Sequence, residues 1–453
     1  MMTQQQKDAR FLQYEEILKE ESKLLQRIQK TMELASPSDA ARLYLYVLIP
    51  MLTGFVQWTL EEALRTGKKR LYFLSRDGYQ MYLLGKKLNE DGNFGIECKY
   101  LNVSRYSMRI PEYHLSLDRA IDQMCINGID VSLTKILQRA ALTQPQIDEV
   151  LEETDLKEDA SKILTYREII ALKNTLKSSK RLMEYIMEYS SAAFDTTISY
   201  LEQEGLLDGV PFALVDSGWV GTLQMSIENL LRTADPEIRV EGYYFGMYEY
   251  PGKVDRTKFH PYYFSPTKGV RRKVDYVNSL FETIVSADEG MTKSYEYRKD
   301  EGYFPVKDVS GNPNREQMLD NIRILEMFLE QEGHLSYDQK KLQKITEKVV
   351  KLFMAFPTEL ELETYGDDLF SDDIIDENRL KVAAELTDEE IRNLRFWNKL
   401  FIVLKIKKGT IRGSSWLEGS IVRNGGNIKS NLRHARFYKY ILYTRKQILF
   451  LRK

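Results

Sequence analysis

The sequence predicts an α/β protein with a mostly parallel, Rossmann-like sheet, a large helical insertion and an all-helical C-terminal region. Short apolar runs such as RLYFL (residues 70–74) and FALV (residues 212–215) alternate with longer amphipathic stretches, which is typical of βαβ units. Both runs end in polar, glycine-containing loops that open a helix, as strands of open parallel sheets do at their carboxyl ends. After about residue 300 the apolar spacing becomes helical.

The elements follow one another in a regular order. A polar stretch with one apolar stripe predicts a helix over residues 7–34, and SPSD at residues 36–39 caps a second helix that Gly67 ends. The strands are predicted at residues 70–74, 96–105, 212–215 and 239–249, with connecting helices at residues 79–90 and 222–233. This order predicts a sheet whose strands are joined by helical crossovers.

Three segments result. Residues 1–35 form an N-terminal helix, and residues 36–300 form the α/β domain. Within that domain, residues 115–206 are mostly helical and form the insertion. Residues 301–453 form the helical C-terminal region, which ends in a basic tail.

Composition favours a cytoplasmic protein. The chain has 453 residues, of which 43% are apolar and 29% charged, as is ordinary for a soluble globular protein. Cys98 and Cys125 lie far apart in the sequence, which argues against a disulfide framework and a structural zinc site. The start of the chain is too polar for a secretory signal. The uncharged residues 43–60 are at the short limit for a bilayer span and are expected to form a buried core helix.

Two strand-to-helix loops carry the candidate site. SRDG (residues 75–78) follows the first predicted strand, and DSGWVGT (residues 216–222) follows the third. In parallel sheets such loops face a common crevice, where glycine lets the backbone approach a ligand and a helix N-terminus offers N–H groups to phosphate. Turn formation and helix capping also account for these residue types, without any ligand.

The side chains in these loops suggest specific roles. Arg76 and Arg105, which follows the second strand, can clamp a phosphate through the guanidinium fork. Asp77 and Asp216 can act in acid–base chemistry, bind sugar hydroxyls or hold a metal ion, for which Mg²⁺ is expected. Glu282 can enter the same crevice or lie on a helix surface. The candidate ligand-binding residues are Ser75, Arg76, Gly78, Ser104, Arg105, Ser217, Gly218, Gly221, Thr222 and Glu282, and the catalytic and metal candidates are Asp77 and Asp216.

The sequence lacks the motifs of several common classes of site. The four histidines are scattered, and none is spaced to share a zinc ion with another. The sequence contains no Walker A loop, no GxGxxG fingerprint and no GxSxG nucleophile elbow.

The charge distribution sets the C-terminal segment apart. Residues 399–453 hold fourteen Lys or Arg and one acid, Glu418, although the whole chain has a net charge of −2. A basic segment of this kind can dock on the acidic body of the same chain, for example near residues 359–377, or on anionic lipid headgroups. The helix expected at about residues 429–451 mixes apolar and basic side chains, as interfacial helices do.

Four blocks of the sequence resemble a known family. FLSRDG, YLNVSRYSMRIP, ALVDSGWVGTLQ and GYYFGMY look like bacterial proteins that occur with capsule or exopolysaccharide biosynthesis and are described as predicted hydrolases of the haloacid dehalogenase (HAD) superfamily. The resemblance covers about residues 40–300. It implies a role in surface-polysaccharide assembly and phosphate chemistry. The Asp-x-Asp-x-Thr nucleophile loop of the HAD domain is absent from this sequence, so the chain resembles the module that accompanies that domain.

The layout is also similar to that of phosphoribosyltransferases. In those enzymes a strand ends in an acidic loop that holds the ribose hydroxyls, and the backbone at the next helix holds the phosphate. The resemblance gives the ribose role to Asp216 and the phosphate role to Gly221 and Thr222, although Ser217 stands where a second acid is usual.

The expected function is therefore a cytoplasmic role in surface-polysaccharide biosynthesis, with a phosphorylated sugar or nucleotide sugar as ligand and no nucleic acid. The alternatives are a phosphoribosyltransferase-like enzyme and a non-catalytic adaptor recruited by its basic tail to membrane glycan machinery at the inner membrane face. A folded crevice that lacks the carboxylate pair Asp77 and Asp216 would favour the adaptor.

Overall fold

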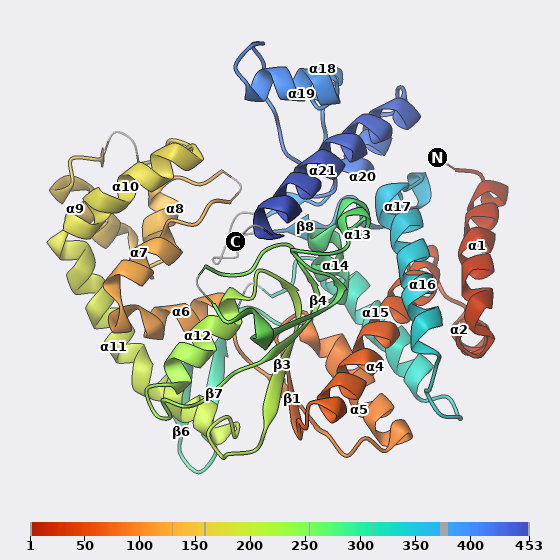
Figure 1. Cartoon of the computed structure of the whole chain (residues 1–453), viewed down its shortest axis with the longest axis horizontal. Coiled ribbons are helices and arrows are strands. Elements are labelled where there is room, and N and C mark those ends of the chain that lie inside the picture. Colours follow the sequence, from red (N-terminus) through yellow and green to blue (C-terminus); the bar gives the residue numbers. More distant parts are fainter. Residues whose placement is uncertain are drawn as a thin grey trace.

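A computed structural model of the chain describes residues 2–128, 130–157, 160–252, 254–309, 311–371 and 379–451. Its centre is a five-stranded sheet in which every neighbouring pair is parallel, with the order β2-β1-β3-β4-β5 (Figure 1). The strands are β1 (Arg70–Leu74), β2 (Glu97–Leu101), β3 (Phe212–Trp219), β4 (Gly242–Met247) and β5 (Phe259–Phe264). The α/β, Rossmann-like fold class is confirmed.

Helices cover both faces of this sheet. Side chains of β1 alternate, so that Leu71 and Phe73 face one layer while Tyr72 and Leu74 face the other. The first layer contains α4 (Ile49–Arg65) and α5 (Gly78–Gly92), and the second contains α12 (Thr222–Leu231) and the end of α11 (Lys180–Gln203). Each strand is thus buried on both sides, which explains its unbroken apolar run.

The order of the strands creates a switch point between β1 and β3. After β1 the chain adds β2 on one side, and then it returns to add β3 on the other side of β1. Open parallel sheets bind ligands outside the carboxyl ends of the strands at such a point, as the 2-1-3-4-5 order of flavodoxin does. The two candidate loops lie there.

The N-terminal helices pack against the same core. They are α1 (Gln4–Leu18), α2 (Ser22–Ala35) and α3 (Asp39–Leu43), and a π-helical turn, η2 (Tyr44–Leu48), joins α3 to α4. Among the described residues, the continuous helix over residues 39–65 is the one segment long and apolar enough to cross a membrane, and 94% of its most apolar window is buried inside the protein. The sequence prediction of a buried helix at residues 43–60 agrees with this packing.

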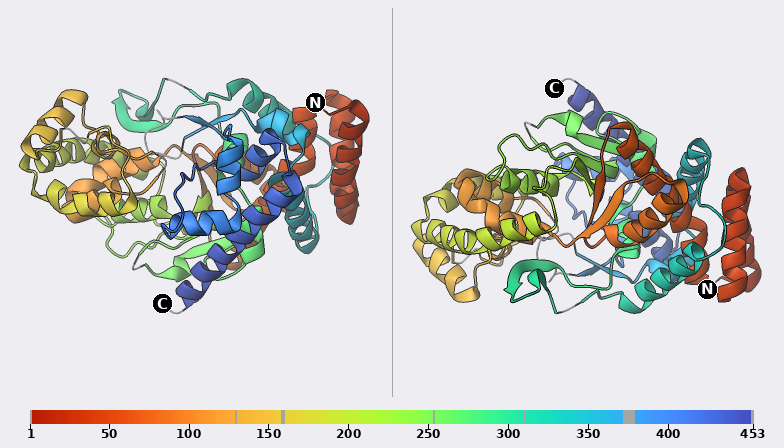
Figure 2. Two further views of the ribbon diagram at one scale, coloured as in Figure 1. Left: turned by 90° about the horizontal axis from the view of Figure 1, so that it is seen from above. Right: turned by 90° about the horizontal axis from the view of Figure 1, so that it is seen from below.

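The helical insertion lies between β2 and β3 and has its own apolar cluster. Figures 1 and 2 show it at one end of the molecule, with the N-terminal helices at the other end. Its helices are α6 (Arg105–Glu112), η3 (Tyr113–Leu115), α7 (Leu117–Met124), α8 (Leu133–Gln138), α9 (Gln144–Glu153), α10 (Tyr166–Ser178) and α11.

Several elements differ from the sequence prediction. The strand β5 was not predicted, and the C-terminal region contains strands although helices alone were expected there. The hairpin of β6 (Thr292–Arg298) and β7 (Gly302–Lys307) crosses the expected boundary at residue 300, because cross-strand packing of aromatic side chains outweighs local propensity. The two-residue strands β8 (Leu369–Phe370) and β9 (Leu380–Lys381) form a second small pair.

The remaining helices complete the C-terminal half. They are α13 (Val270–Asp275), α14 (Asn278–Val285), α15 (Arg315–Leu329), α16 (Gln339–Val350), α17 (Glu359–Tyr365), α18 (Asp388–Asn393), α19 (Phe396–Val403), α20 (Leu417–Asn424) and α21 (Ile428–Leu451).

One hydrophobic core joins the three expected segments. A single cluster of buried side chains extends from Phe11 through the sheet to Trp416. A buried polar contact reinforces it, since Glu361 accepts hydrogen bonds of 2.6 Å from both Arg10 Nε and Tyr14 Oη. The N-terminal and C-terminal helices therefore pack as parts of the α/β core.

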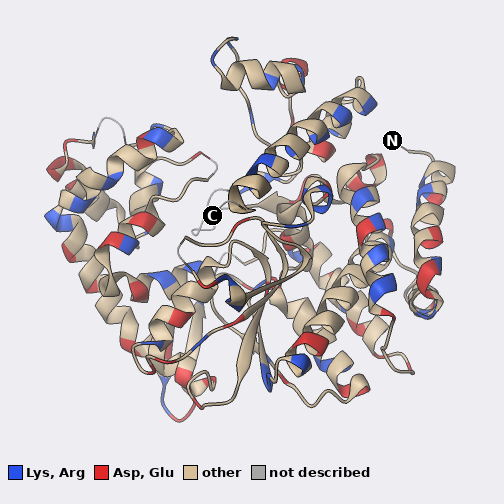
Figure 3. Ribbon diagram, viewed as in Figure 1, with Lys and Arg blue, Asp and Glu red and all other residues tan. Residues whose placement is uncertain are grey.

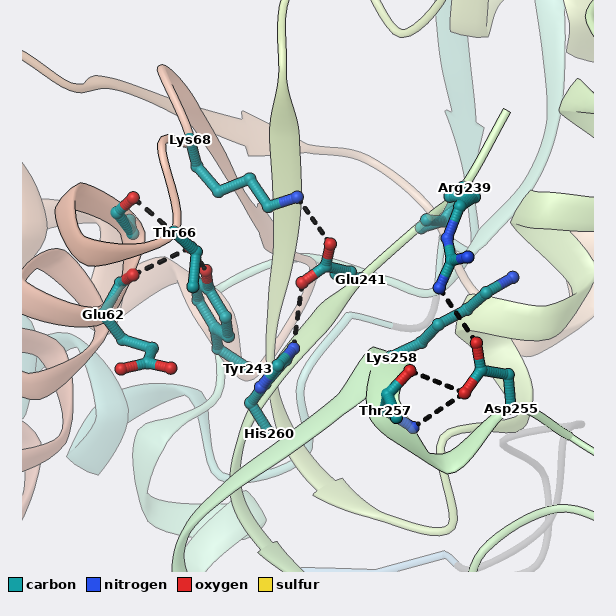
Figure 4. A network of polar contacts seen from close by, with 12 residues as sticks. Glu62, Thr66, Lys68, Arg239, Glu241, Tyr243, Asp255, Thr257, Lys258 and His260 are labelled. Carbon is teal, nitrogen blue, oxygen red and sulfur yellow. Dashed lines mark hydrogen bonds and ion pairs between the residues drawn. The ribbon is translucent and has the colours of Figure 1, made fainter. Parts of the chain in front are cut away.

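Polar groups at the amino ends of the strands pair with one another. Glu241, just before β4, lies between Lys68 Nζ at 2.7 Å and His260 Nε2 at 2.9 Å, and the Tyr243 and Thr66 hydroxyls share a hydrogen bond of 2.7 Å (Figure 4). These contacts tie β1, β4 and β5 together at one edge of the sheet. The polar groups at the opposite edge are arranged differently and line a cavity.

The contact between Arg10 and Glu361 gives a test of the shared core. Glu361→Ala leaves a buried guanidinium without its carboxylate, so we expect the free energy of unfolding to fall by about 3–5 kcal/mol. Urea denaturation measures this. The matched control is Glu363→Ala, an exposed neighbour whose loss should change stability by less than about 0.5 kcal/mol. Equal effects of the two changes would contradict the structural role of the pair.

Candidate functional site

A polar cavity with a volume of about 320 Å³ lies at the carboxyl ends of β1, β2 and β3. The loops after these three strands form its floor, and α14 forms one wall. Residues 312–314 and 369–371 from the C-terminal half also line it. The expected crevice is thus present at the β1/β3 switch point, where strand order favours a ligand site.

The structure brings nearly all the predicted site residues together in this cavity. Its lining includes Ser75, Arg76, Asp77, Ser104, Arg105, Asp216, Ser217, Gly218, Gly221, Thr222 and Glu282. Gly78 is the exception. It lies in the first turn of α5, where a Cβ atom would meet the backbone carbon of Phe73 at 2.9 Å, so helix–strand packing explains this glycine and ligand binding does not.

The loop after the third strand is shorter than predicted, because β3 runs on through Trp219. Asp216 and Gly218 therefore belong to the strand and pair with Tyr244 and Gly246 of β4. At Gly218, φ is +119° and a Cβ atom would meet the Gly246 carbonyl oxygen at 2.2 Å. Only glycine allows β3 and β4 to approach this closely at the cavity.

Trp219 has an unusual backbone for a large residue, with φ of +83°. Its indole Nε1 donates a hydrogen bond to Glu282 Oε1, and its ring packs against Tyr276 with ring centres 5.2 Å apart. Its carbonyl accepts a 2.9 Å bond from the Tyr248 N–H. Positive φ in a non-glycine residue costs on the order of 1–3 kcal/mol and is found most often at functional sites. These contacts hold the indole against Glu282 in spite of that cost.

Three serines of the lining make internal hydrogen bonds. Ser75 Oγ donates to the Val103 carbonyl at 2.7 Å, which joins the loops after β1 and β2. Ser104 Oγ caps α6 by accepting from the Ser107 N–H at 2.9 Å. Ser217 Oγ donates to Asp77 Oδ2 at 2.7 Å. These hydroxyls position the loops, and the carboxyl and guanidinium groups are left as the main groups for a ligand.

Three carboxyl groups share the cavity. Burial raises the pKa of Asp77, while Ser217, Arg76 and Arg105 oppose the rise. Burial and then the negative charge of Asp77 raise the pKa of Asp216 to about 7. The same two causes, in the same order, raise the pKa of Glu282 to about 8. At neutral pH the three groups cannot all be ionised, so the cavity retains at least one carboxyl proton.

A buried arginine lies beside the start of α12. Arg109 Nη2 donates a 3.0 Å hydrogen bond to Thr222 Oγ1, and burial lowers the pKa of its guanidinium to about 10. Among the described residues no carboxylate forms an ion pair with Arg109. Gly221 caps α12 with φ of +74°, which leaves the N–H groups of the first turn at the cavity. Arg105, one helical turn before Arg109, lies exposed at the cavity mouth.

Sequence reasoning missed several residues of the site. Arg109 lies four positions after Arg105, a spacing that places both on one face of a helix, and this signal could have been used. Arg109 itself lies behind the lining, where it contacts Thr222. Asn278, Asn312 and Asn314 line the cavity, but they come from segments whose position only the tertiary fold determines.

The sequence predicts that Asp77 and Asp216 can hold Mg²⁺. Among the described residues, no group of three or more Asp, Glu, His or Cys side chains is arranged to hold a metal ion. Asp77 and Asp216 remain adequate for Mg²⁺ of the kind that binds through one or two carboxylates and the phosphate of a substrate.

Neither protein-family models nor curated protein sequences give a match to this chain. The cavity chemistry therefore carries the functional argument.

The raised pKa values predict how stability depends on pH. The folded protein holds the protons of Asp216 and Glu282 to higher pH than the unfolded chain does, so their contribution is complete below about pH 4 and is lost as pH rises towards 7–8. Asp216→Asn should reduce this fall in unfolding free energy by on the order of 1–3 kcal/mol.

Urea denaturation between pH 4.5 and 8 with EDTA present, at about half-unit steps, would measure the effect. The exposed turn residue Asp300, replaced by Asn, is the control. Identical pH profiles for wild type and Asp216→Asn would show that the carboxyl groups do not share a proton in the folded protein.

Proposed function

We propose that the cavity binds a phosphorylated sugar or nucleotide sugar and catalyses cleavage or transfer at the bond between sugar and phosphate. One observation carries this proposal: three carboxyl groups and two arginines converge on one cavity at the β1/β3 switch point. Arginines match the anionic phosphate, and carboxyl groups match sugar hydroxyls and proton transfer.

The phosphate is assigned to the side of the cavity formed by Arg76, Arg105 and the first turn of α12. Arg76 and Arg105 both face the cavity, and the free N–H groups of α12 add partial positive charge. Arg109 strengthens this side, because its buried charge is held against Thr222. Phosphate binding here would provide a counter-charge for that guanidinium.

The carboxyl groups are assigned to proton transfer and to the sugar. Burial and the charge of Asp77 raise the pKa of Glu282 to about 8, and Glu282 Oε1 accepts a hydrogen bond from Trp219, so we assign the carboxyl proton to Oε2. A carboxylic acid kept protonated at neutral pH can give that proton to a leaving oxygen. Asp77 and Asp216 then bind sugar hydroxyls, and whichever is ionised can stabilise positive charge that develops on the sugar. Mg²⁺, if bound by these two groups and the phosphate, would neutralise phosphate charge.

The biological setting rests on the resemblance to proteins of surface-polysaccharide biosynthesis. We propose a cytoplasmic step in that process, with phosphate or glycosyl-phosphate chemistry of the kind the HAD-related label suggests. The adaptor hypothesis expected a crevice without the carboxylate pair, and the lining of this cavity by both Asp77 and Asp216 supports an enzyme over an adaptor.

A second candidate is a phosphoribosyltransferase-like reaction. The specific observation in its favour is that Asp216 lies at the end of β3, while Gly221 and Thr222 open the next helix on the same cavity. In this version the sugar is ribose, its hydroxyls bind at Asp216, and a terminal phosphate binds at the start of α12. The two candidates share one cavity and differ in the sugar.

Arg76→Lys tests the role of the arginine fork. Lysine keeps the charge but lacks two parallel N–H donors, so we expect affinity for a phosphorylated ligand to fall about tenfold or more. Calorimetry with glucose 1-phosphate, uridine diphosphate glucose, ribose 5-phosphate and phosphoribosyl diphosphate would identify the ligand class and measure the loss.

Arg119→Lys is the matched control, since Arg119 lies outside the cavity and pairs with Glu112. Equal affinity of wild type and Arg76→Lys for a ligand that binds the wild-type protein would assign Arg76 to structure. Binding of glucose without phosphate as tightly as glucose 1-phosphate would remove the phosphate assignment.

A further inference from the structure

The C-terminal helix α21 has one face packed on the protein and another face left open. On the packed side, Lys439 pairs with Glu418 at 2.7 Å, Lys446 with Glu249 at 2.6 Å and Arg436 with Asp275 at 2.5 Å. Tyr443 stacks on Tyr248 with ring centres 5.5 Å apart. The expectation that the tail docks on its own body is therefore correct for this face of the helix. Of the stretch at 359–377 suggested for docking, Asp367 pairs with Arg423 of α20, and residues 372–377 lie outside the described residues.

The open side of α21 is apolar. Exposed side chains recur at Phe437, Ile441, Ile448 and Leu451, spaced as on one face of a helix, and Tyr440 and Leu449 widen the stripe. A shallow groove of about 460 Å³ runs along this stripe and is lined almost entirely by apolar atoms. Surface stripes of this kind mark sites of interaction with a partner.

A second apolar element extends the stripe. Helix α19 packs against α21 through Phe396, whose ring centre lies 4.8 Å from that of Phe437. Beyond it, Trp397 is 61% exposed, and the loop after α19 presents Leu404 and Ile406 at 57% and 70% exposure. In Figure 1, α19 and its loop project from the body beside α21. We call the exposed side chains of residues 397–408 together with the open side of α21 the apolar–basic surface.

The charge of this surface has one sign. Lys405, Lys407 and Lys408 alternate with the exposed apolar residues of the loop, and Arg433 and Arg445 flank the stripe of α21. From Ile391 to the end of the sequence the only acid is Glu418, which is fully buried and paired with Lys439. Figure 3 shows Lys and Arg in blue along α21.

We propose that the apolar–basic surface is a docking surface for an anionic lipid bilayer, a function separate from the chemistry of the cavity. Leucine, isoleucine and tryptophan side chains enter the boundary between headgroups and acyl chains, while the lysines pair with lipid phosphates. A second copy of the chain would place this uncompensated positive charge against itself, since the surface holds no exposed acid. A polyanion such as nucleic acid would leave the apolar stripe exposed to water.

Point substitutions on the open side of α21 and on the loop after α19 test the docking surface better than deletion of the C-terminal segment does. Removal of residues 428–453 would expose core contacts of α13 and Tyr248, so point changes on the open side are the cleaner variants. Lys405→Glu/Lys407→Glu/Lys408→Glu reverses the charge of the loop. Leu404→Ser/Ile406→Ser removes two exposed apolar side chains. Lys23→Glu/Lys30→Glu/Lys299→Glu makes the same charge change at exposed lysines elsewhere.

Sedimentation of the full chain with vesicles measures docking. We expect binding to phosphatidylglycerol–phosphatidylcholine vesicles at low salt, release as salt rises, and no binding to pure phosphatidylcholine. Each lysine near an anionic surface contributes about fivefold in affinity, so the loop triple variant should lose on the order of 100-fold. The control triple should retain binding within about threefold.

Tryptophan fluorescence reports whether the apolar part enters the bilayer. Trp397 is the exposed one of the four tryptophans, so its emission should shift to shorter wavelength with anionic vesicles and be quenched by brominated lipid. Trp397→Phe should abolish the shift and leave sedimentation largely intact. Leu404→Ser/Ile406→Ser should reduce both.

Several results would overturn the proposal. The proposal fails if wild-type protein does not sediment with phosphatidylglycerol vesicles at low salt. It also fails if the loop triple variant and the control triple variant lose vesicle affinity equally. A concentration-dependent dimer in light scattering that Phe437→Ser/Ile448→Ser converts to monomer would assign the surface to a second copy. Because these assays do not depend on sugar phosphates, they can fail or succeed independently of the proposed cavity chemistry.

Discussion

The parallel pairing of β1 with β3 determines where the candidate site forms, because it brings the ends of both strands to the same edge of the sheet. Phe73 lies beside Val215 in the register, so the two strands reach the same edge of the sheet together. Because β1 stops at Leu74 and β3 continues to Trp219, the polar residues after one strand meet those at the end of the other. Asp77 and Asp216 are brought close enough for the charge of one to raise the pKa of the other.

Other groups of the cavity offset the repulsion between the carboxylates of Asp77 and Asp216. Burial raises the pKa of Asp77, and this rise is opposed by a hydrogen bond from Ser217 and by the charges of Arg76 and Arg105. The insertion contributes through α6, which begins at the end of β2 and carries Arg105 and Arg109 towards the cavity. Arg105 and Arg109 thus come from a helix that the topology places beside the acids, while Arg76 comes from the loop after β1.

Much of the fold and most of the floor of the cavity could be predicted from the sequence, because both depend on local patterns. Apolar runs identify β1 to β4, and polar loops after them identify Asp77, Arg105 and Asp216. The remainder could not be predicted, for physical reasons that differ. FHPYYF forms β5 only because β4 offers an unpaired edge, and its proline and histidine hide the strand pattern. Asn312 and Asn314 reach the cavity because α15, which follows them, packs on the core. No local sequence pattern predicts this tertiary contact.

The C-terminal region combines two kinds of surface on one element. Along α21, residues that face the body make ion pairs and ring contacts. Residues that face outward are apolar and are flanked by the exposed basic side chains of Arg433 and Arg445. A sequence average over the helix conceals this, since apolar and basic residues alternate around its whole circumference. The packing of α13, α20 and the segment at Tyr248 and Glu249 against one side of the helix separates the two faces.

The contact between Arg10 and Glu361 joins residues 351 positions apart. Protein synthesis proceeds at about 5–20 residues per second, so a ribosome needs on the order of tens of seconds to make the intervening chain. During that interval α1 and α2 have emerged, but the helix that neutralises their buried arginine does not yet exist. Helix α1 therefore cannot make this buried contact until α17 has been made. The core of this topology is complete only after α17 (Glu359–Tyr365) has been made, although the sheet can begin to form much earlier.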